Sequence, residues 1–136
     1  MACPYFHPVE VRASDARAAM LPLGDFWVGT CHARADESCQ PEEAAMRPLC
    51  NLGYARGQCQ RFPVEDPGPD AVRFTIRREE GRSLHLYYVL ERDHHPFSHG
   101  ALEYSMEARR FTNAPTGGLL ARQAEAYVAS YLRRKG

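Results

Sequence analysis

The placement of five cysteines constrains this chain more than any other feature, because all of them lie in its first 59 residues: Cys3, Cys31, Cys39, Cys50 and Cys59. The first residues, from Met1 to His7, have neither the basic segment nor the apolar segment of a secretory signal peptide. We therefore expect a reducing, cytoplasmic compartment, where structural disulfides are uncommon. An odd number of cysteines also fits a fully paired disulfide framework poorly. Clustered thiols in such a chain point to metal ligation or redox chemistry.

Length and charge narrow the possibilities further. The chain has 136 residues, which suits one domain with a single core. It carries 17 basic and 17 acidic residues, so its net charge is zero and gives no reason to expect nucleic acid or an anionic membrane as a partner. No segment approaches the roughly 20 apolar residues that a membrane-spanning helix needs. We expect a globular protein with no membrane span.

The cysteine-bearing half, residues 1–63, is divided into short pieces by proline and glycine. Its pattern predicts loops and short helices rather than a sheet. The expected elements are a helix over 10–20, or a shorter one capped by Ser14 and Asp15, an extended or loop segment over 25–31, one or two helical turns over 41–47 that Pro48 ends, and a glycine-shaped loop over 50–59.

A turn-rich connector over 63–70 leads into the second half, residues 70–136, which has clearer periodicity. Apolar and polar residues alternate on both sides of a short turn at Gly81, which predicts a β-hairpin over about residues 71–91. The further expectations are a loop over 92–100, a third strand over 101–111 with a helix as the alternative, and a helix over about 118–134. The sequence therefore predicts a single α+β domain.

Four of the cysteines stand in segments suited to holding a [4Fe–4S] cluster. Such a cluster needs four thiolates from loops in which glycine, proline and backbone N–H groups approach the sulfur atoms. Pro4 follows Cys3, Gly29 precedes Cys31, and Gly53 and Gly57 lie between Cys50 and Cys59. The chain thus resembles iron–sulfur proteins as a class. The resemblance rests on the Cys3-Pro4 pair and the 50–59 loop, and it implies ligation by Cys3, Cys31, Cys50 and Cys59.

The fifth cysteine differs, because Cys39 lies in a polar, acidic stretch. Acidic neighbours disfavour the thiolate that a metal requires, so we expect Cys39 to be an exposed bystander. Several other residues near the proposed ligands are candidates for supporting roles. The N–H groups from Gly53 to Cys59 are candidates for an anion-binding nest, and the supporting residues are Gly53, Tyr54, Arg56, Gly57, His7 and His32.

Alternatives to a cluster remain open at this point. The cysteine spacing lacks the short C-x₂-C signature that is typical of structural zinc sites and of ferredoxins. A zinc-stabilised or metal-free interaction module is therefore one alternative, with the cysteines as small buried hydrophobic residues. A thiol redox protein, with Cys39 or Cys59 as an exposed reactive thiol, is another. The expected function is that of a small iron–sulfur protein in electron transfer, redox sensing or cluster-based small-molecule chemistry. It would act with a redox partner protein or a small molecule.

Other polar motifs give weaker signals. Asp93, His94, His95 and His99 offer metal-binding side chains, but Pro96 interrupts the helix that their spacing would need, and a surface turn is the preferred interpretation. Arg56 lies between two glycines and is suited either to binding an anion or to offsetting the charge of a cluster. The chain has no P-loop, G-x-G-x-x-G, H-E-x-x-H or G-x-S-x-G motif.

Overall fold

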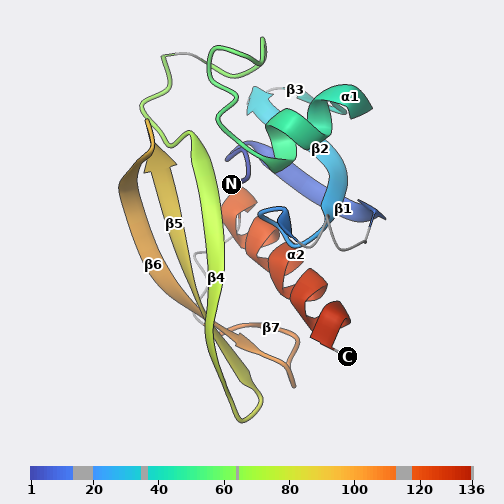
Figure 1. The fold of residues 1–136 in the computed structure, drawn as a ribbon, viewed down its shortest axis with the longest axis vertical. Helices are drawn as coiled ribbons and strands as arrows, with labels where there is room; N and C mark the ends of the chain where they lie inside the picture. Colours follow the sequence, from blue (N-terminus) through green and yellow to red (C-terminus); the bar gives the residue numbers. More distant parts are fainter. Residues whose placement is uncertain (14–19, 35–36, 64, 113–117, 136) are drawn as a thin grey trace.

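The computed structural model describes residues 1–13, 20–34, 37–63, 65–112 and 118–135. They form two antiparallel sheets, one of three strands and one of four, together with a long C-terminal helix. Figure 1 shows the helix running alongside both sheets. The three-stranded sheet and the short helices lie near the end of the four-stranded sheet where its first strand begins, at residue 71. The mixed α+β class is confirmed, but strands dominate where the sequence predicted loops and helices.

The three-stranded sheet has the order β1-β2-β3, with β1 over Phe6–Ala13, β2 over Phe26–Arg34 and β3 over Glu37–Cys39. The extended segment predicted over 25–31 is therefore confirmed within β2. Gly29 in β2 is required by a close approach of the two backbones, because a Cβ atom there would lie 2.0 Å from the carbonyl oxygen of His7.

The helix predicted over residues 10–20 is wrong in its first part. Residues as far as Ala13 belong to β1, which pairs with β2 in a register that joins Phe6 to Cys31 and Val11 to Trp27. The local alanine and arginine content favours a helix, but pairing with the buried strand β2 overrides that weak preference. Ser14 and Asp15, the alternative capping residues, lie outside the described residues.

The helical turns predicted over 41–47 are confirmed, but they do not end at Pro48. Helix α1, Glu43–Ala45, continues directly into the π-helical segment η2, Met46–Asn51. Pro48 thus lies inside the helical stretch, where its missing N–H leaves one helical hydrogen bond unmade, and the stretch is π-helical there. The helix instead ends after Asn51, whose side-chain amide donates to the carbonyl oxygen of Met46 at 3.0 Å.

The four-stranded sheet has the order β4-β5-β6-β7, with β4 over Ala71–Glu80, β5 over Ser83–Arg92, β6 over His95–Ser105 and β7 over Arg110–Phe111. The predicted hairpin is confirmed as β4 and β5. The strand preferred for 101–111 is confirmed as far as Ser105, after which a turn leads to β7.

The loop predicted over 92–100 is shorter than expected. Asp93 and His94 form a two-residue turn with φ angles of 51° and 63°, and β6 begins at His95. Positive φ at both central positions is the geometry that matches the twist of a tight hairpin. Pro96 is tolerated because this part of β6 pairs with β5 alone, since β7 pairs with β6 only at Tyr104 and Ser105.

The C-terminal helix α2, Gly118–Lys135, confirms the helix predicted over 118–134. The buried core draws on both halves of the chain, and it includes Phe6, Trp27, Phe74, Leu84, Leu86, Leu102, Ala124, Ala126 and Val128. The segment before β1 also pairs with β4, because Ala2 and Val72 exchange two backbone hydrogen bonds of 2.8 Å. None of the helices in the described ranges combines the length and apolar character that a membrane crossing requires.

One buried amide connects α2 to the start of the chain. The Nε2 atom of Gln123 donates to the carbonyl oxygens of Cys3 and Phe6, at 2.8 Å in both cases, and its residue is fully buried. Backbone carbonyls buried without a donor are costly, so this amide sets where the Cys3 segment lies against the helix.

We expect Gln123→Met to lower the free energy of unfolding by about 1–3 kcal/mol, because it removes a donor from two buried carbonyls while nearly preserving side-chain volume. Urea denaturation followed by circular dichroism measures the change. The matched control is Gln40→Met, the same substitution at an exposed position, for which we expect a change within about 0.5 kcal/mol. Equal midpoints for the two variants would contradict the structural role of Gln123.

Candidate functional site

The site begins with Cys31 on β2. Residues alternate between the two faces of a strand, so Cys31 and Ala33 share the inner face while His32 lies on the other. Cys31 is buried, with 8% of its surface exposed, and its register partner on β1 is Phe6. The central strand of the smaller sheet thus places this thiol at the interior.

Cys50 is placed by η2, and its neighbour Asn51 holds that segment against β2. The fully buried Asn51 side chain accepts from the backbone N–H of Trp27 at 3.1 Å and donates to the carbonyl oxygen of Trp27 at 2.9 Å. It pairs with this backbone as a neighbouring strand would. Cys50 is therefore fixed relative to the strand that carries Cys31.

Cys3 lies on the segment that leads into β1. Its backbone N–H donates to the carbonyl oxygen of Cys50 at 3.0 Å, and its own carbonyl oxygen accepts from Gln123. Cys59 comes from the loop after η2, where its N–H and that of Gln58 both donate to the carbonyl oxygen of Ala55, at 2.7 and 2.9 Å. Four separate segments therefore supply the four thiols.

All four predicted cysteines line one cavity of about 40 Å³. This is more room than a single water molecule needs and much less than a typical ligand pocket has. The wall between the thiols is almost entirely apolar, apart from Arg61, and its other lining residues are Tyr5, Phe6, Ala33, Pro41, Ala45, Leu49, Ala55 and Phe62. Tyr5 and Phe62 meet edge to face, with ring centroids 5.3 Å apart. The thiols thus face a largely dry interior.

The surroundings hold two of these thiols in the protonated form. Burial, together with the neighbouring thiols of Cys31 and Cys59, raises the pKa of Cys3 well above its ordinary range. Burial and the neighbouring cysteines also raise the pKa of Cys50 to about 12. Metal binding at this cavity would therefore have to release protons from these thiols.

Cys39 differs from its predicted state. It is half-buried rather than exposed, and it is the register partner of Cys31 across β2 and β3. It is not among the residues that line the cavity, although its charge contributes to the raised pKa of Cys50. A fifth thiol therefore lies beside the four.

No group of three or more histidine, cysteine, aspartate or glutamate side chains in the described ranges is arranged to hold a metal ion. The four cysteines share a cavity, but their positions do not already form a ligand shell around one point.

The anion-binding nest expected between Gly53 and Cys59 is not formed by the N–H groups whose partners the structure shows. The backbone N–H groups of Gly53 and Tyr54 donate to the carbonyl oxygens of Leu49 and Asp70, at 2.8 and 3.2 Å respectively. The N–H groups of Gln58 and Cys59 donate to the carbonyl oxygen of Ala55. The loop closes on its own backbone instead. A glycine is needed at position 53 for a steric reason. Its φ is 77°, and a Cβ atom there would lie 2.4 Å from the carbonyl oxygen of Met1. Gly57 also has a positive φ, of 83°.

His7 and His32 lie on the opposite face of the small sheet from Cys31. Their ring centroids are 5.3 Å apart, and the Nε2 atom of His32 shares a hydrogen bond of 3.0 Å with the hydroxyl of Thr30. Neither histidine is among the cavity-lining residues of the described chain, so neither is placed to substitute for a thiolate. Strand alternation places His32 on the face opposite to its sequence neighbour Cys31, and His7 shares that face with His32.

Tyr54 links the cysteine loop to the turn between β5 and β6. Its hydroxyl donates to Glu91 at 2.5 Å and accepts from the backbone N–H of His94 at 3.1 Å, and its ring stacks on that of His94 at 4.1 Å. Burial and this bond to the Glu91 carboxylate raise the pKa of Tyr54 to about 12. Tyr54 and His94 both have positive φ, so these contacts hold two unfavourable backbone conformations.

Arg56 forms an ion pair with Asp70 rather than pointing at the cavity. Its Nε atom lies 2.7 Å from Asp70 Oδ1, and its guanidinium stacks over Phe62 at 4.8 Å from the ring centroid. Asp70 also accepts from the backbone N–H of Asp93 at 2.9 Å. The carboxylate therefore joins the cysteine loop, the connector and the β5–β6 turn, a role that the sequence pattern did not reveal.

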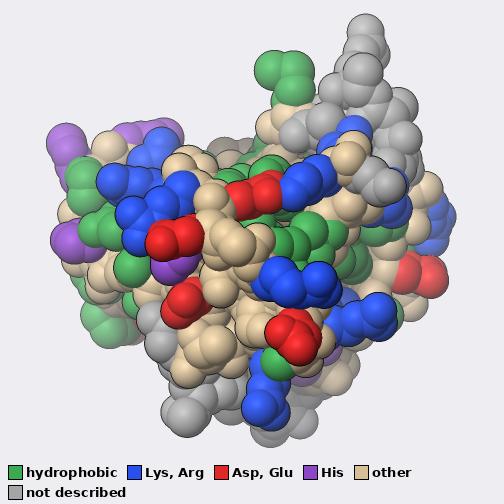
Figure 2. All heavy atoms as spheres, turned by 90° about the horizontal axis from the view of Figure 1, so that it is seen from below, with side chains coloured by type: hydrophobic (Ala, Val, Ile, Leu, Met, Phe, Trp, Pro, Cys, Tyr) green, Lys and Arg blue, Asp and Glu red, His purple; other side chains and the backbone are tan. Residues whose placement is uncertain are grey.

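The three histidines after β5 do not converge on one point. His94 stacks on Tyr54, and His99 shares a hydrogen bond of 2.7 Å with the hydroxyl of Tyr87. The predicted surface turn is confirmed for Asp93 and His94 only, because His95 and His99 belong to β6. Lys and Arg side chains also lie next to Asp and Glu on the face drawn in Figure 2, rather than forming an extended basic surface.

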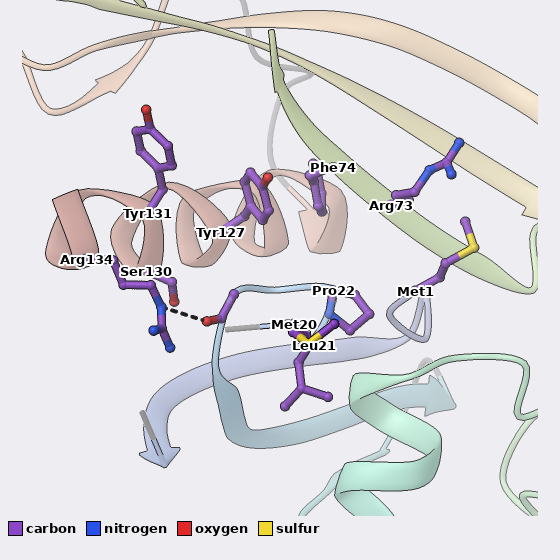
Figure 3. Close-up of a pocket in the computed structure, with 11 residues that line it drawn as sticks. Met1, Met20, Leu21, Pro22, Arg73, Phe74, Tyr127, Ser130, Tyr131 and Arg134 are labelled. Atoms are coloured by element: carbon purple, nitrogen blue, oxygen red, sulfur yellow. Dashed lines mark hydrogen bonds between the residues drawn. The ribbon is translucent and has the colours of Figure 1, made fainter. Parts of the chain in front are cut away.

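A second and larger cavity, of about 380 Å³, lies between α2, β4 and residues 20–24 (Figure 3). Phe74, Tyr127 and Tyr131 form its aromatic side, and the Nε atom of Arg134 donates to the carbonyl oxygen of Gly24 at 3.2 Å across its edge. It contains none of the cysteines and lies apart from the predicted site.

Comparison with known proteins adds no assignment. The chain matches no model of a protein family, and it has no significant match among curated proteins or solved structures.

The ion pair of Asp70 predicts a pH-dependent contribution to stability. Burial alone would raise the pKa of Asp70, but the hydrogen bonds from Arg56 and the Asp93 N–H outweigh it and hold the pKa below its ordinary value of 3.8. A lowered pKa in the folded state stabilises the fold above the unfolded pKa, and this contribution is lost as the pH falls through the folded pKa.

We expect Asp70→Asn to lower the free energy of unfolding by about 1.5–3 kcal/mol near pH 7, and the difference from the native chain to shrink below about pH 4. Urea titrations between pH 3 and pH 7 measure it. Glu65→Gln, at an exposed carboxylate in the same connector, serves as the control. A difference that stays constant across this range would rule out the charged pair as its cause.

Proposed function

We propose that this protein binds an iron–sulfur cluster of the [4Fe–4S] type through Cys3, Cys31, Cys50 and Cys59. The observation that carries the proposal is the convergence of these four thiols on one cavity, although they come from four segments spread over the first 59 residues. Four ligating cysteines are what a cluster of this kind requires.

The character of the cavity wall favours a cluster. Apolar and aromatic residues surround the thiols, and such a shell limits the access of water to iron and sulfide. Arg61 also lines the cavity, and its Nε atom and one terminal nitrogen are shielded from solvent. A cluster with four thiolates carries net negative charge, so a guanidinium in the wall offsets part of that charge.

A zinc ion is the less favoured occupant. Tetrahedral zinc places all four sulfur atoms about 2.3 Å from one point, and the described chain contains no group so arranged. A cubane cluster instead gives each thiolate its own iron atom, so its ligands lie farther apart. A cluster would require the small cavity to widen, whereas a zinc ion would require the four sulfur atoms to draw closer to one point. Either rearrangement would occur as the metal site forms.

The ligand count separates two uses of the cluster. Four cysteines leave every iron fully ligated, which suits electron transfer to a partner protein or redox sensing. Three cysteines would leave one iron open for binding a small molecule. All four cysteines line the cavity, two of them buried and two half-buried, and this full set of ligands favours the first use.

Anaerobic purification or reconstitution is expected to give a brown protein with near-stoichiometric iron and acid-labile sulfide. The visible spectrum and iron, sulfide and zinc analyses of one sample provide the measurement. A colourless protein with one bound zinc would instead establish the structural module. A colourless, metal-free protein after reconstitution would leave only core or redox thiols.

Single serine variants test the ligand set. Replacing Cys3, Cys31, Cys50 or Cys59 is expected to abolish or strongly reduce cluster content, because each removes one iron ligand. Cys39→Ser is the matched control and should retain the cluster, since Cys39 does not line the cavity. Circular dichroism of the metal-free variants separates loss of the cluster from loss of the fold. The proposal fails if the cluster persists in all four variants.

A further inference from the structure

The smaller sheet places two thiols directly opposite each other. Cys31 on β2 and Cys39 on β3 are register partners in an antiparallel pair. We propose that these two cysteines form a reversible disulfide, an oxidation site that shares only Cys31 with the cavity of four thiols. The inference rests on the strand register, so it does not depend on the presence of a cluster.

Strand geometry brings the two residues within bonding reach. Directly opposed residues of an antiparallel pair have Cα atoms about 4.5–5.5 Å apart and side chains on the same face. A disulfide requires Cα atoms about 4.4–6.8 Å apart. Cys31 and Cys39 therefore need no backbone rearrangement to be joined. Only seven residues separate them along the chain, so little further entropy is lost when the bond closes.

Their unequal burial suggests the order of events. Cys39 is half-buried, whereas Cys31 is buried, so we expect an oxidant to reach Cys39 first. With glutathione disulfide as the oxidant, the Cys39 sulfur first attacks it and releases one glutathione thiol. The Cys31 sulfur then attacks the Cys39 sulfur of the mixed disulfide and releases the second. Two protein thiols are oxidised, one glutathione disulfide is reduced, and the two thiol protons end on the released glutathione.

Cys31 also belongs to the four-thiol cavity, and this gives the pair a consequence that rests on the proposed function. A sulfur atom that bonds Cys39 is not available to iron. Disulfide formation would therefore remove one of the four cluster ligands and prevent reassembly until the bond is reduced. Conversely, a bound cluster would protect Cys31 from oxidation.

Peptide mapping tests the pairing directly. Cleavage after arginine and glutamate places each of the five cysteines on its own peptide, with Cys31 in residues 18–34 and Cys39 in residues 38–42. The reduced, metal-free full chain is treated with glutathione disulfide and analysed by mass spectrometry. The expected product is a cross-link between these two peptides, with the loss of two hydrogen atoms.

Variants make the result specific. Cys31→Ser and Cys39→Ser are each expected to eliminate the cross-link, whereas Cys59→Ser, which changes a cavity thiol outside the pair, should retain it. Circular dichroism confirms that each variant is folded. A dominant cross-link between any other two cysteines would overturn the proposal, and so would recovery of Cys39 as a stable glutathione adduct.

A second arm distinguishes this proposal from the cluster. If the chain binds no cluster but the cross-link forms, the pair stands and the proposed function fails. If a cluster forms but the metal-free chain gives no cross-link, the pair fails and the proposed function stands. The cluster-loaded chain should show strongly reduced cross-linking. Equal cross-linking with and without the cluster would overturn the competition for Cys31.

Discussion

The Gln123 amide connects the end of this chain to its beginning, and the arrangement of the thiol cavity depends on it. Its two hydrogen bonds hold the Cys3–Phe6 segment against α2. That segment carries Cys3 into the cavity and Phe6 into the pairing with Cys31. An amide buried in an apolar core tolerates few positions, because displacement would remove a hydrogen bond from both of its carbonyl partners. The position of the helix therefore determines where the first thiol lies.

Two of the other thiols, those of Cys50 and Cys59, are positioned by equally specific polar contacts. Asn51 pairs with the backbone of Trp27 and fixes Cys50 beside β2. Asp70 and Tyr54 connect the turn after β5 with the loop that carries Cys59. The apolar wall gives the thiols nonpolar surroundings, but its packing contacts have no preferred direction. Hydrogen bonds of buried amides and carboxylates determine the registration of segments that are far apart in sequence.

The five cysteines thus fall into two overlapping sets that meet at Cys31. One set surrounds a cavity suited to a metal cluster, and the other is a pair across two strands. Both arrangements follow from the same strand, because β2 turns Cys31 toward the interior and β3 pairs alongside it. In the proposed scheme, ligation and oxidation compete for one sulfur atom, so the cluster state and the thiol redox state of the protein are coupled.

Local pattern alone determined the hairpin over 71–91 and the helix over 118–134. The four cysteines that it singled out line one cavity, and their role as ligands stays a prediction. Strict alternation and helical periodicity are properties of neighbouring residues, and they survive whatever the rest of the chain does. The β1 strand, the extension of β6 through Pro96 and the half-buried state of Cys39 were decided only by tertiary structure. Each depends on a partner strand that the local sequence does not specify. The same holds for Gln123, Asn51 and Asp70, whose partners are mostly backbone groups far away in the sequence and leave no periodic trace.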